Sequence, residues 1–151
     1  MKKDVRSKIT RNKFTALNHV LNTECIPALE ALCRLVGKEE KISVEMKTDR
    51  RAAGRGYGDI PILKRALLCL LCVRITNIFD DKRGISFRDF KVKLQKDKIV
   101  KDMITTRHTW FGHIGRENNN IVSAKEICNS NLKKRLEGAS SCLMEIYFKI
   151  D

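Results

Sequence analysis

The sequence lacks the features that anchor a chain in a membrane or mark it for export. No apolar run approaches the roughly 18–20 residues that are needed to cross a bilayer. The first residues, Met1 to Asp4, are charged, and no apolar stretch follows them as it would in a secretory signal. At 151 residues, the chain has the length of one domain. We therefore expect a soluble single-domain protein that acts in the cytoplasm.

Signals for β-strands are also missing. The sequence shows no convincing alternation of apolar and polar residues, no hairpin dipeptide and no internal repeat. Apolar residues recur instead at helical steps from Phe14 to Leu35, and an almost continuous apolar stretch runs from Ile62 to Phe79. Hydrophobic residues make up 42% of the chain, which is enough for a core. The sequence predicts an all-α, single-domain helical bundle of about five helical segments.

Acidic residues are scarce relative to basic ones. The chain has 31 Lys and Arg residues against 18 Asp and Glu residues, so its formal net charge is +13. A charge this far from neutrality favours a polyanionic partner. RNA or DNA is the first candidate and an anionic membrane the second. We predict a nucleic-acid partner, RNA, and no membrane partner.

Nothing in the sequence indicates a disulfide framework, a metal site or a cofactor. Most of the six cysteines sit among apolar residues, where buried free thiols are common. Cys69 and Cys72 form a C-x-x-C pair, but it lies inside a continuous apolar stretch and no second pair has the spacing of zinc ligands. We expect free thiols, no bound metal and no cofactor.

The first half of the chain carries two signals that interrupt helices. Pro27 lies inside the first apolar stripe and predicts a kink or a break there. Gly37 directly follows the stripe, as is typical of the residue after a helix end. Residues 1–13 form a basic N-terminal arm, which is either disordered or the first turns of a helix. Residues 14–151 form the helical domain.

Residues 38–60 have the composition of an irregular basic loop. Gly54, Gly56 and Gly58 alternate here. A Gly-rich turn binds phosphate when it follows a strand, and no strand is predicted before this one. The loop is therefore either a mobile connection or a segment that contacts RNA. The residues that would make the RNA contacts are Arg50, Arg51 and Arg55.

The second half of the chain contains recognisable helix starts. Pro61 is typical of a first turn and predicts a helix that begins near Asp59. Ser86 predicts the start of a short helix. Asp97 or Asp102 starts another helix, which reaches Trp110.

A capping box at Ser123 and Glu126 starts the last helical segment. Gly138 is expected to interrupt this segment.

One cluster has the composition of a reactive site, and it runs from Arg107 to His113. A histidine titrates near neutral pH, so His113 can give or take a proton. Arg107 offers several donors suited to a phosphate. On an ideal helix these two residues are roughly 120° apart, so a helix end loosened at Gly112 or a second subunit would complete the site. Solvated side chains at a helix end are the simpler interpretation.

The cluster resembles the R-x(4–6)-H motif of the HEPN superfamily, with a polar residue, His108, after the arginine. The preceding segment, from Ile78 to Phe90, is similar to the AbiU2-like branch of that superfamily. In that branch a hydrophobic helix ends in an acidic residue, and a turn, a Ser and a short helix follow. The resemblance covers roughly residues 62–120.

The resemblance implies a dimeric α-helical bundle with metal-independent endoribonuclease activity. Such proteins occur in toxin–antitoxin, abortive-infection and anti-phage defence systems, and two copies of the motif form one composite active site at the dimer interface. It implies that His113 is the general acid/base, that Arg107 neutralises the scissile phosphate, and that His108 orients the site or contacts RNA. The expected products carry a 2′,3′-cyclic phosphate and a 5′-hydroxyl. An antitoxin protein is a further expected partner.

Several residues around the motif are candidates for RNA contacts. Trp110 can stack on an unpaired base, although core or dimer-interface packing is an alternative. Lys98 and Lys101 lead into the motif and Arg116 follows it, and each is either a phosphate contact or a solvated side chain. Two functions other than cleavage stay open. The chain is then a non-catalytic nucleic-acid-binding module or an inactive HEPN-like interaction protein.

Overall fold

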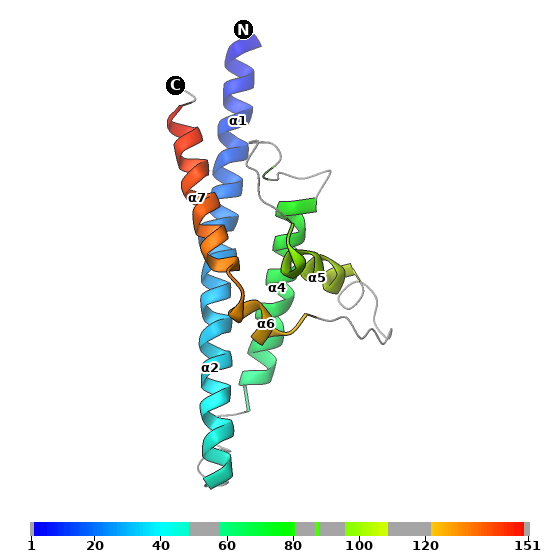
Figure 1. Ribbon diagram of the computed structural model, residues 1–151. Helices are drawn as coiled ribbons and strands as arrows, with labels where there is room; N and C mark the ends of the chain where they lie inside the picture. Colours follow the sequence, from blue (N-terminus) through cyan, green and yellow to red (C-terminus); the bar gives the residue numbers. More distant parts are fainter. Residues whose placement is uncertain (1, 49–57, 81–86, 88–95, 109–121, 150–151) are drawn as a thin grey trace.

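The computed structural model describes residues 2–48, 58–80, 87, 96–108 and 122–149. Within these ranges the regular elements are helices and no strand occurs, which confirms the predicted all-α class and the count of about five helical segments. No helix among these residues is long and apolar enough to span a membrane. The elements, labelled in Figure 1, are α1 (Lys2–His19), the π-helix η1 (Val20–Cys25), α2 (Ile26–Thr48), α4 (Ile60–Asp80), α5 (Lys98–Thr106), α6 (Ala124–Asn129) and α7 (Leu132–Phe148).

The first three elements form one uninterrupted helical rod, so the break predicted at Pro27 is wrong. The N–H of Ile26 donates to the carbonyl of Leu21, five residues back, which is the π-helical pattern. Pro27 has no N–H to donate, and its ring would clash with the carbonyl four residues earlier in a regular α-helix. The wider turn directly before Pro27 accommodates this residue, and the rod passes the site without a sharp bend (Figure 1).

The rod also continues through Gly37, so the predicted helix end at this residue is wrong. An interior glycine costs about 1 kcal/mol relative to alanine. Contacts further along α2 offset this cost, because Ile42 is buried against Ile60 of α4. Residues 38–48 of the predicted loop are therefore helical. The N-terminal arm is helical from Lys2, in agreement with the helical alternative.

Helix α4 is the central element, as its apolar composition predicts. It packs on α2 and η1 and also on α5. Its buried residues include Leu71, Cys72 and Ile75, all 0% exposed. Pro61 lies in its first turn, as predicted.

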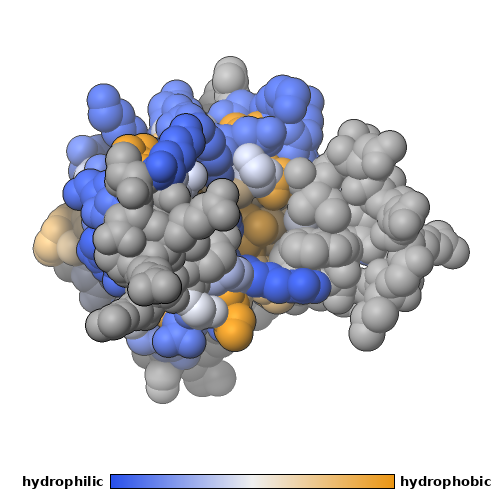
Figure 2. Space-filling model, turned by 90° about the horizontal axis from the view of Figure 1, so that it is seen from below, coloured by the Kyte–Doolittle hydropathy of each residue, from blue (hydrophilic) through white to orange (hydrophobic). Residues whose placement is uncertain are grey.

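Some hydrophobic side chains of α4 stay exposed, among them Ile62 at 70% and Leu63 at 49%. These two residues lie at the start of α4, near the end of the molecule where α2 finishes. Figure 2 views the molecule from this end, where the described surface is mostly hydrophilic and hydrophobic residues show at a few places.

Helix α7 runs antiparallel to α1, so that the start of α1 and the end of α7 lie together (Figure 1). It is continuous from Leu132 to Phe148, so the interruption predicted at Gly138 is wrong. The rings of Phe14 and Tyr147 stack at a centroid distance of 4.4 Å. One face of α7 is buried in the core through Leu132, Leu136, Ala139 and Leu143.

The six cysteines are free thiols, as predicted, but they are not all buried. Cys25 and Cys72 are buried and Cys142 is exposed, while the other three are intermediate. Among the residues that the structure describes, no group of three His, Cys, Asp or Glu side chains is placed to hold a metal ion. The C-x-x-C pair at Cys69 and Cys72 thus gains no third ligand from the described part of the chain.

Candidate functional site

Helix α5 carries the candidate site at its C-terminal end. Its start is the predicted one at Asp97, whose Oδ1 accepts the N–H of Val100 at 3.1 Å. One face of the helix is inserted in the core, because Val100, Met103 and Thr106 are all 0% exposed. The residues of the opposite face are spaced by three, four and three positions, and all of them are exposed. This face consists of Lys98, Lys101, Thr105 and His108.

The structure thus brings together three of the predicted site residues, Lys98, Lys101 and His108, on one exposed face. Lys98 forms an ion pair with Asp102 at 2.6 Å, and this hydrogen bond raises the pKa of Lys98. Lys101 makes no ion pair or hydrogen bond with any residue that the structure describes. Lys101 is therefore the cation of this face that is open to an external anion.

Arg107 lies on the other side of α5. It follows Met103 by four residues and Val100 by seven, which places it above the core-facing row. The residue is half-buried. Its backbone N–H bonds to the carbonyls of Ile104 and Met103, while its guanidinium makes no ion pair or hydrogen bond with another described residue. Arg107 is a cation at the boundary between core and solvent whose charge is not neutralised by a described carboxylate.

A buried hydrogen bond joins the end of α5 to the chain before α6. The Thr106 hydroxyl donates to the carbonyl of Asp102 at 2.8 Å and accepts the N–H of Val122 at 3.0 Å. Val122 is 2% exposed. Val122, the first described residue after the segment 109–121, therefore lies against Thr106, the residue that precedes Arg107.

The remaining predicted site residues lie outside the described residues. His113, Trp110 and Arg116 belong to the segment 109–121, and the three arginines of the predicted basic loop belong to the segment 49–57. Of the predicted catalytic set, the structure places Arg107 and His108 next to each other at one helix end. Their side chains start about 100° apart around the helix axis.

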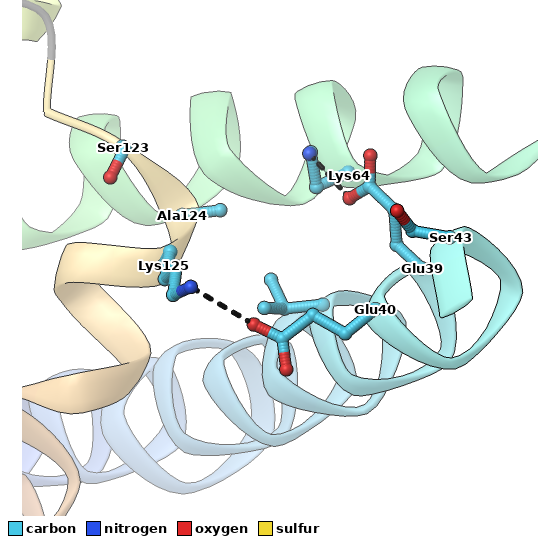
Figure 3. Close-up of a pocket in the computed structure, with 8 residues that line it drawn as sticks. Glu39, Glu40, Ser43, Lys64, Ser123, Ala124 and Lys125 are labelled. Atoms are coloured by element: carbon cyan, nitrogen blue, oxygen red, sulfur yellow. Dashed lines mark hydrogen bonds and ion pairs between the residues drawn. The ribbon is translucent and has the colours of Figure 1, made fainter. Parts of the chain in front are cut away.

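A pocket of about 390 Å³ lies between α2, α4 and α6, and sequence reasoning missed it (Figure 3). Two ion pairs line it, Lys64 with Glu39 at 2.7 Å and Lys125 with Glu40 at 3.3 Å. The pocket depends on α2 continuing past Gly37, where the sequence predicted a loop. The signal that could have revealed it is the pair of adjacent glutamates, Glu39 and Glu40, which suits a helix that lies between two basic neighbours.

The chemistry of this pocket favours a structural role. Its two carboxylates and two ammonium groups neutralise one another, so it offers no unpaired charge to a substrate. Neither histidine nor cysteine is among its lining residues. A neighbouring hollow of about 310 Å³ shares Lys64, Ser123 and Ala124 with it and reaches Val122. The end of α5 is therefore the better candidate for chemistry on a phosphate.

Comparisons of the chain with known protein families, with curated proteins and with solved structures give no match.

Proposed function

We propose that the chain is a metal-independent endoribonuclease of the HEPN type, which acts in the cytoplasm as a toxin or anti-phage defence effector. The observation that supports this proposal is the environment of Arg107, a half-buried guanidinium that has no described carboxylate partner. Removing a cation from water is unfavourable unless an anion compensates it. A phosphate of RNA supplies that anion and suits the guanidinium geometry.

The proposed reaction is an internal transesterification of RNA. The 2′-hydroxyl attacks the adjacent phosphorus, the bond from phosphorus to the 5′-oxygen of the next nucleotide breaks, and a 2′,3′-cyclic phosphate and a 5′-hydroxyl result. His113 moves the proton between these oxygens as general acid/base. Arg107 stabilises the charge on the phosphate oxygens in the transition state. His108, on the same exposed face as Lys101, orients the site or contacts the RNA.

We further propose that two chains form a homodimer in which two copies of the motif make one composite site. Exposed hydrophobic residues on α4 support an association of this kind. Ile62 and Leu70 are 70% and 37% exposed and lie two helical turns apart. Sedimentation or light scattering of the purified chain tests this part, and a monomer at assay concentration would contradict it. An antitoxin protein that restrains the nuclease is a further proposed partner.

The deciding experiment is incubation with tRNA and total RNA in EDTA. We expect the wild type to cut RNA, and we expect His113→Ala to lower the rate by about 10²–10⁴-fold. Arg107→Ala is expected to lower it by about 10²–10³-fold. His19→Ala is the matched control, because His19 is an exposed histidine at the junction of α1 and η1, remote in sequence from α5.

Circular dichroism confirms that each variant is folded. Undiminished cleavage by folded His113→Ala would refute the proposed mechanism.

A second candidate is a nucleic-acid-binding module without catalysis. The unpaired Lys101 and the net charge of +13 favour it as much as they favour an enzyme. RNA that is bound with a steep salt dependence but stays intact in the wild-type assay would identify this function.

A further inference from the structure

The charged residues of helix α2 differ in whether another helix supplies a partner of opposite charge. Three of its glutamates each form an ion pair with a lysine of a different neighbouring helix. Glu30 pairs with Lys133 of α7 at 3.2 Å. Glu39 pairs with Lys64 of α4 and Glu40 with Lys125 of α6. Glu39 lies on the side of α2 that faces α4, whereas Glu30 and Glu40 form their pairs from more exposed positions, with 41% and 58% of their side chains exposed.

The basic residues Arg34, Lys38 and Lys41 form a row on the exposed side of α2, one turn after Glu30. They follow one another by four and three residues and are all exposed. The core-facing residues Leu32 and Val36 are on the other side of the helix. None of the three cations makes an ion pair or hydrogen bond with a residue of the described chain. Their positive charge is therefore directed to solvent, and no described carboxylate pairs with it directly.

This alignment exists because α2 continues through Gly37. If the helix ended at Gly37, Arg34 would stand on a helix and the two lysines on a loop. In the continuous helix the three residues span about 10 Å along the axis. The row is acidic at both ends, because Glu30 precedes Arg34 by four residues and Glu45 follows Lys41 by four, so the cations of this face are these three.

We propose that Arg34, Lys38 and Lys41 form a stripe that binds the phosphate backbone of RNA. The inference rests on the proposed function, since it takes RNA as the partner, and it adds a second contact surface to the site at α5. A stripe of about 10 Å is long enough to contact two or three successive phosphates of a strand. Three cations in one row that have no described partner complement the regular row of negative charges along an RNA backbone.

The surroundings of the stripe favour RNA over an anionic membrane. A helix that lies in a membrane surface needs an apolar face beside its basic residues. The apolar face of α2 is buried in the bundle, where Leu29 and Leu32 are 1% and 0% exposed. Among the described residues of α2, Val44 is the one large hydrophobic side chain that is well exposed. One exposed valine beside the last lysine of the stripe is too small an apolar surface for a helix to insert in a membrane.

The stripe and the candidate site lie on different sides of the molecule. Helix α4 packs on both α2 and α5 and lies between them in Figure 1. The stripe faces away from α4, because Glu39 on the bundle side of α2 is the residue paired with Lys64. An RNA that contacts both surfaces must pass around the bundle, so we expect a long or folded RNA to bind more tightly than a short oligonucleotide.

The test measures RNA binding in a His113→Ala background, in which the RNA stays intact. The stripe variant is Arg34→Gln with Lys38→Gln and Lys41→Gln. The matched control is Lys47→Gln with Lys134→Gln and Lys149→Gln, which lowers the net charge of +13 by the same three units at exposed positions on other faces. Fluorescence anisotropy with tRNA between 50 and 200 mM salt gives the affinity and its salt dependence.

We expect the stripe variant to lower the salt slope by about 2 and to raise Kd about tenfold at low salt, since each phosphate contact contributes about 0.7 to the slope for single strands. The control variant is expected to change both values much less. A charge-preserving variant, Arg34→Lys with Lys38→Arg and Lys41→Arg, is expected to bind like the parent and keeps the result interpretable if the glutamine variant unfolds.

Equal losses of RNA affinity in the stripe and control variants would contradict RNA binding by the stripe. An unchanged affinity in both variants would contradict it as well. Loss of binding to phosphatidylserine vesicles with unchanged RNA binding would overturn it in favour of a membrane. These outcomes are independent of the proposed function, because cleavage by the wild type and its loss in His113→Ala test that function separately. If the stripe variant binds RNA more weakly but the wild type never cuts RNA, the stripe is supported and the nuclease function is refuted.

Discussion

The hydroxyl of Thr106 accepts the backbone N–H of Val122 at 3.0 Å inside the protein. This hydrogen bond joins the end of α5 to the residues that precede α6. Thr106 is 0% exposed, so water does not replace this bond. The bond lies next to Arg107. It therefore fixes Val122, the first described residue after the segment 109–121, at the end of α5.

Replacing Thr106 with valine is expected to lower both stability and RNA cleavage. Valine has nearly the same shape but leaves the buried N–H of Val122 without an acceptor, which costs about 1–3 kcal/mol. Urea denaturation measures the free energy of unfolding, and the EDTA cleavage assay measures activity. Thr106→Ser retains the hydroxyl and is expected to stay closer to the wild type. If the valine and serine variants are equally stable and active, this hydrogen bond has no such role.

Asp97 combines two contributions that single substitutions can separate. Its Oδ1 caps α5, and its carboxylate pairs with the Arg135 guanidinium of α7. Asp97→Asn keeps a capping oxygen and loses the ion pair, which is worth less than about 1 kcal/mol for partly exposed groups. Asp97→Ala also loses the cap and is expected to cost about 1 kcal/mol more.

Thermal or urea denaturation of the two Asp97 variants measures this difference. Lys98→Gln is the control, because Lys98 is 85% exposed and its pair with Asp102 is expected to have no measurable effect. An alanine variant as stable as the asparagine variant would show that the cap contributes nothing.

Glu24 of η1 and Arg74 of α4 form an ion pair at the π-helical turn. Arg74 Nη2 donates to Glu24 Oε1 at 3.2 Å, whereas Arg74 Nε and Glu24 Oε2 are inaccessible to water and are not aligned as a hydrogen bond. Arg74→Met is expected to destabilise the fold by about 1–2 kcal/mol, since it leaves a partly buried carboxylate. The full cost of a buried pair does not apply, because the side chains are 36% and 27% exposed.

The double variant Glu24→Gln with Arg74→Met removes the carboxylate charge as well. We expect it to recover part of the lost stability in urea denaturation. A double variant that is less stable than Arg74→Met alone would contradict this account of the pair.

The buried thiols predict a loss of stability at high pH. Burial raises the pKa of Cys25 and of Cys72 from 9.0 to about 12. Above pH 9 the unfolded chain releases these protons while the folded chain retains them, so the free energy of unfolding falls as pH rises toward 12. The expected loss between pH 8 and pH 10 is about 1 kcal/mol for each buried thiol.

Urea denaturation of the wild type and of Cys25→Ala with Cys72→Ala at both pH values tests this dependence. The double variant is less stable throughout because it loses core packing, so the comparison uses the change with pH rather than the absolute value. Cys142→Ala is the control, because Cys142 is exposed. An equal change with pH in the wild type and the double variant would contradict a role for the two thiols.

The features that the sequence predicted correctly are local. The caps at Asp97 and Ser123 each accept an N–H from three residues ahead, so a few neighbouring residues contain the whole signal. The start of α4 at Pro61 likewise depends on one turn of chain. The apolar spacing of the core faces needs only the helix period, and it correctly indicated an all-α bundle.

Pro27 and Gly37 show where local signals fail. Both residues disfavour a helix interior, and the sequence alone predicted an interruption at each. The structure keeps the helix because α2 is held on both sides of these residues. Its second half is held by Ile42, which is buried against Ile60 of α4, and by the partly buried pair of Glu39 with Lys64. A reading of neighbouring residues does not contain these distant contacts.

The sequence by itself determined the helical class, the main caps, the charge excess and the cluster from Arg107 to His113. Only the tertiary structure decided which of the charges are compensated. It pairs Glu30, Glu39 and Glu40 with lysines of other helices, and it leaves Arg34, Lys38 and Lys41 in one row on the outer face of α2. The physical reason is that pairing depends on distances of a few ångströms between helices, whereas composition counts charges without placing them.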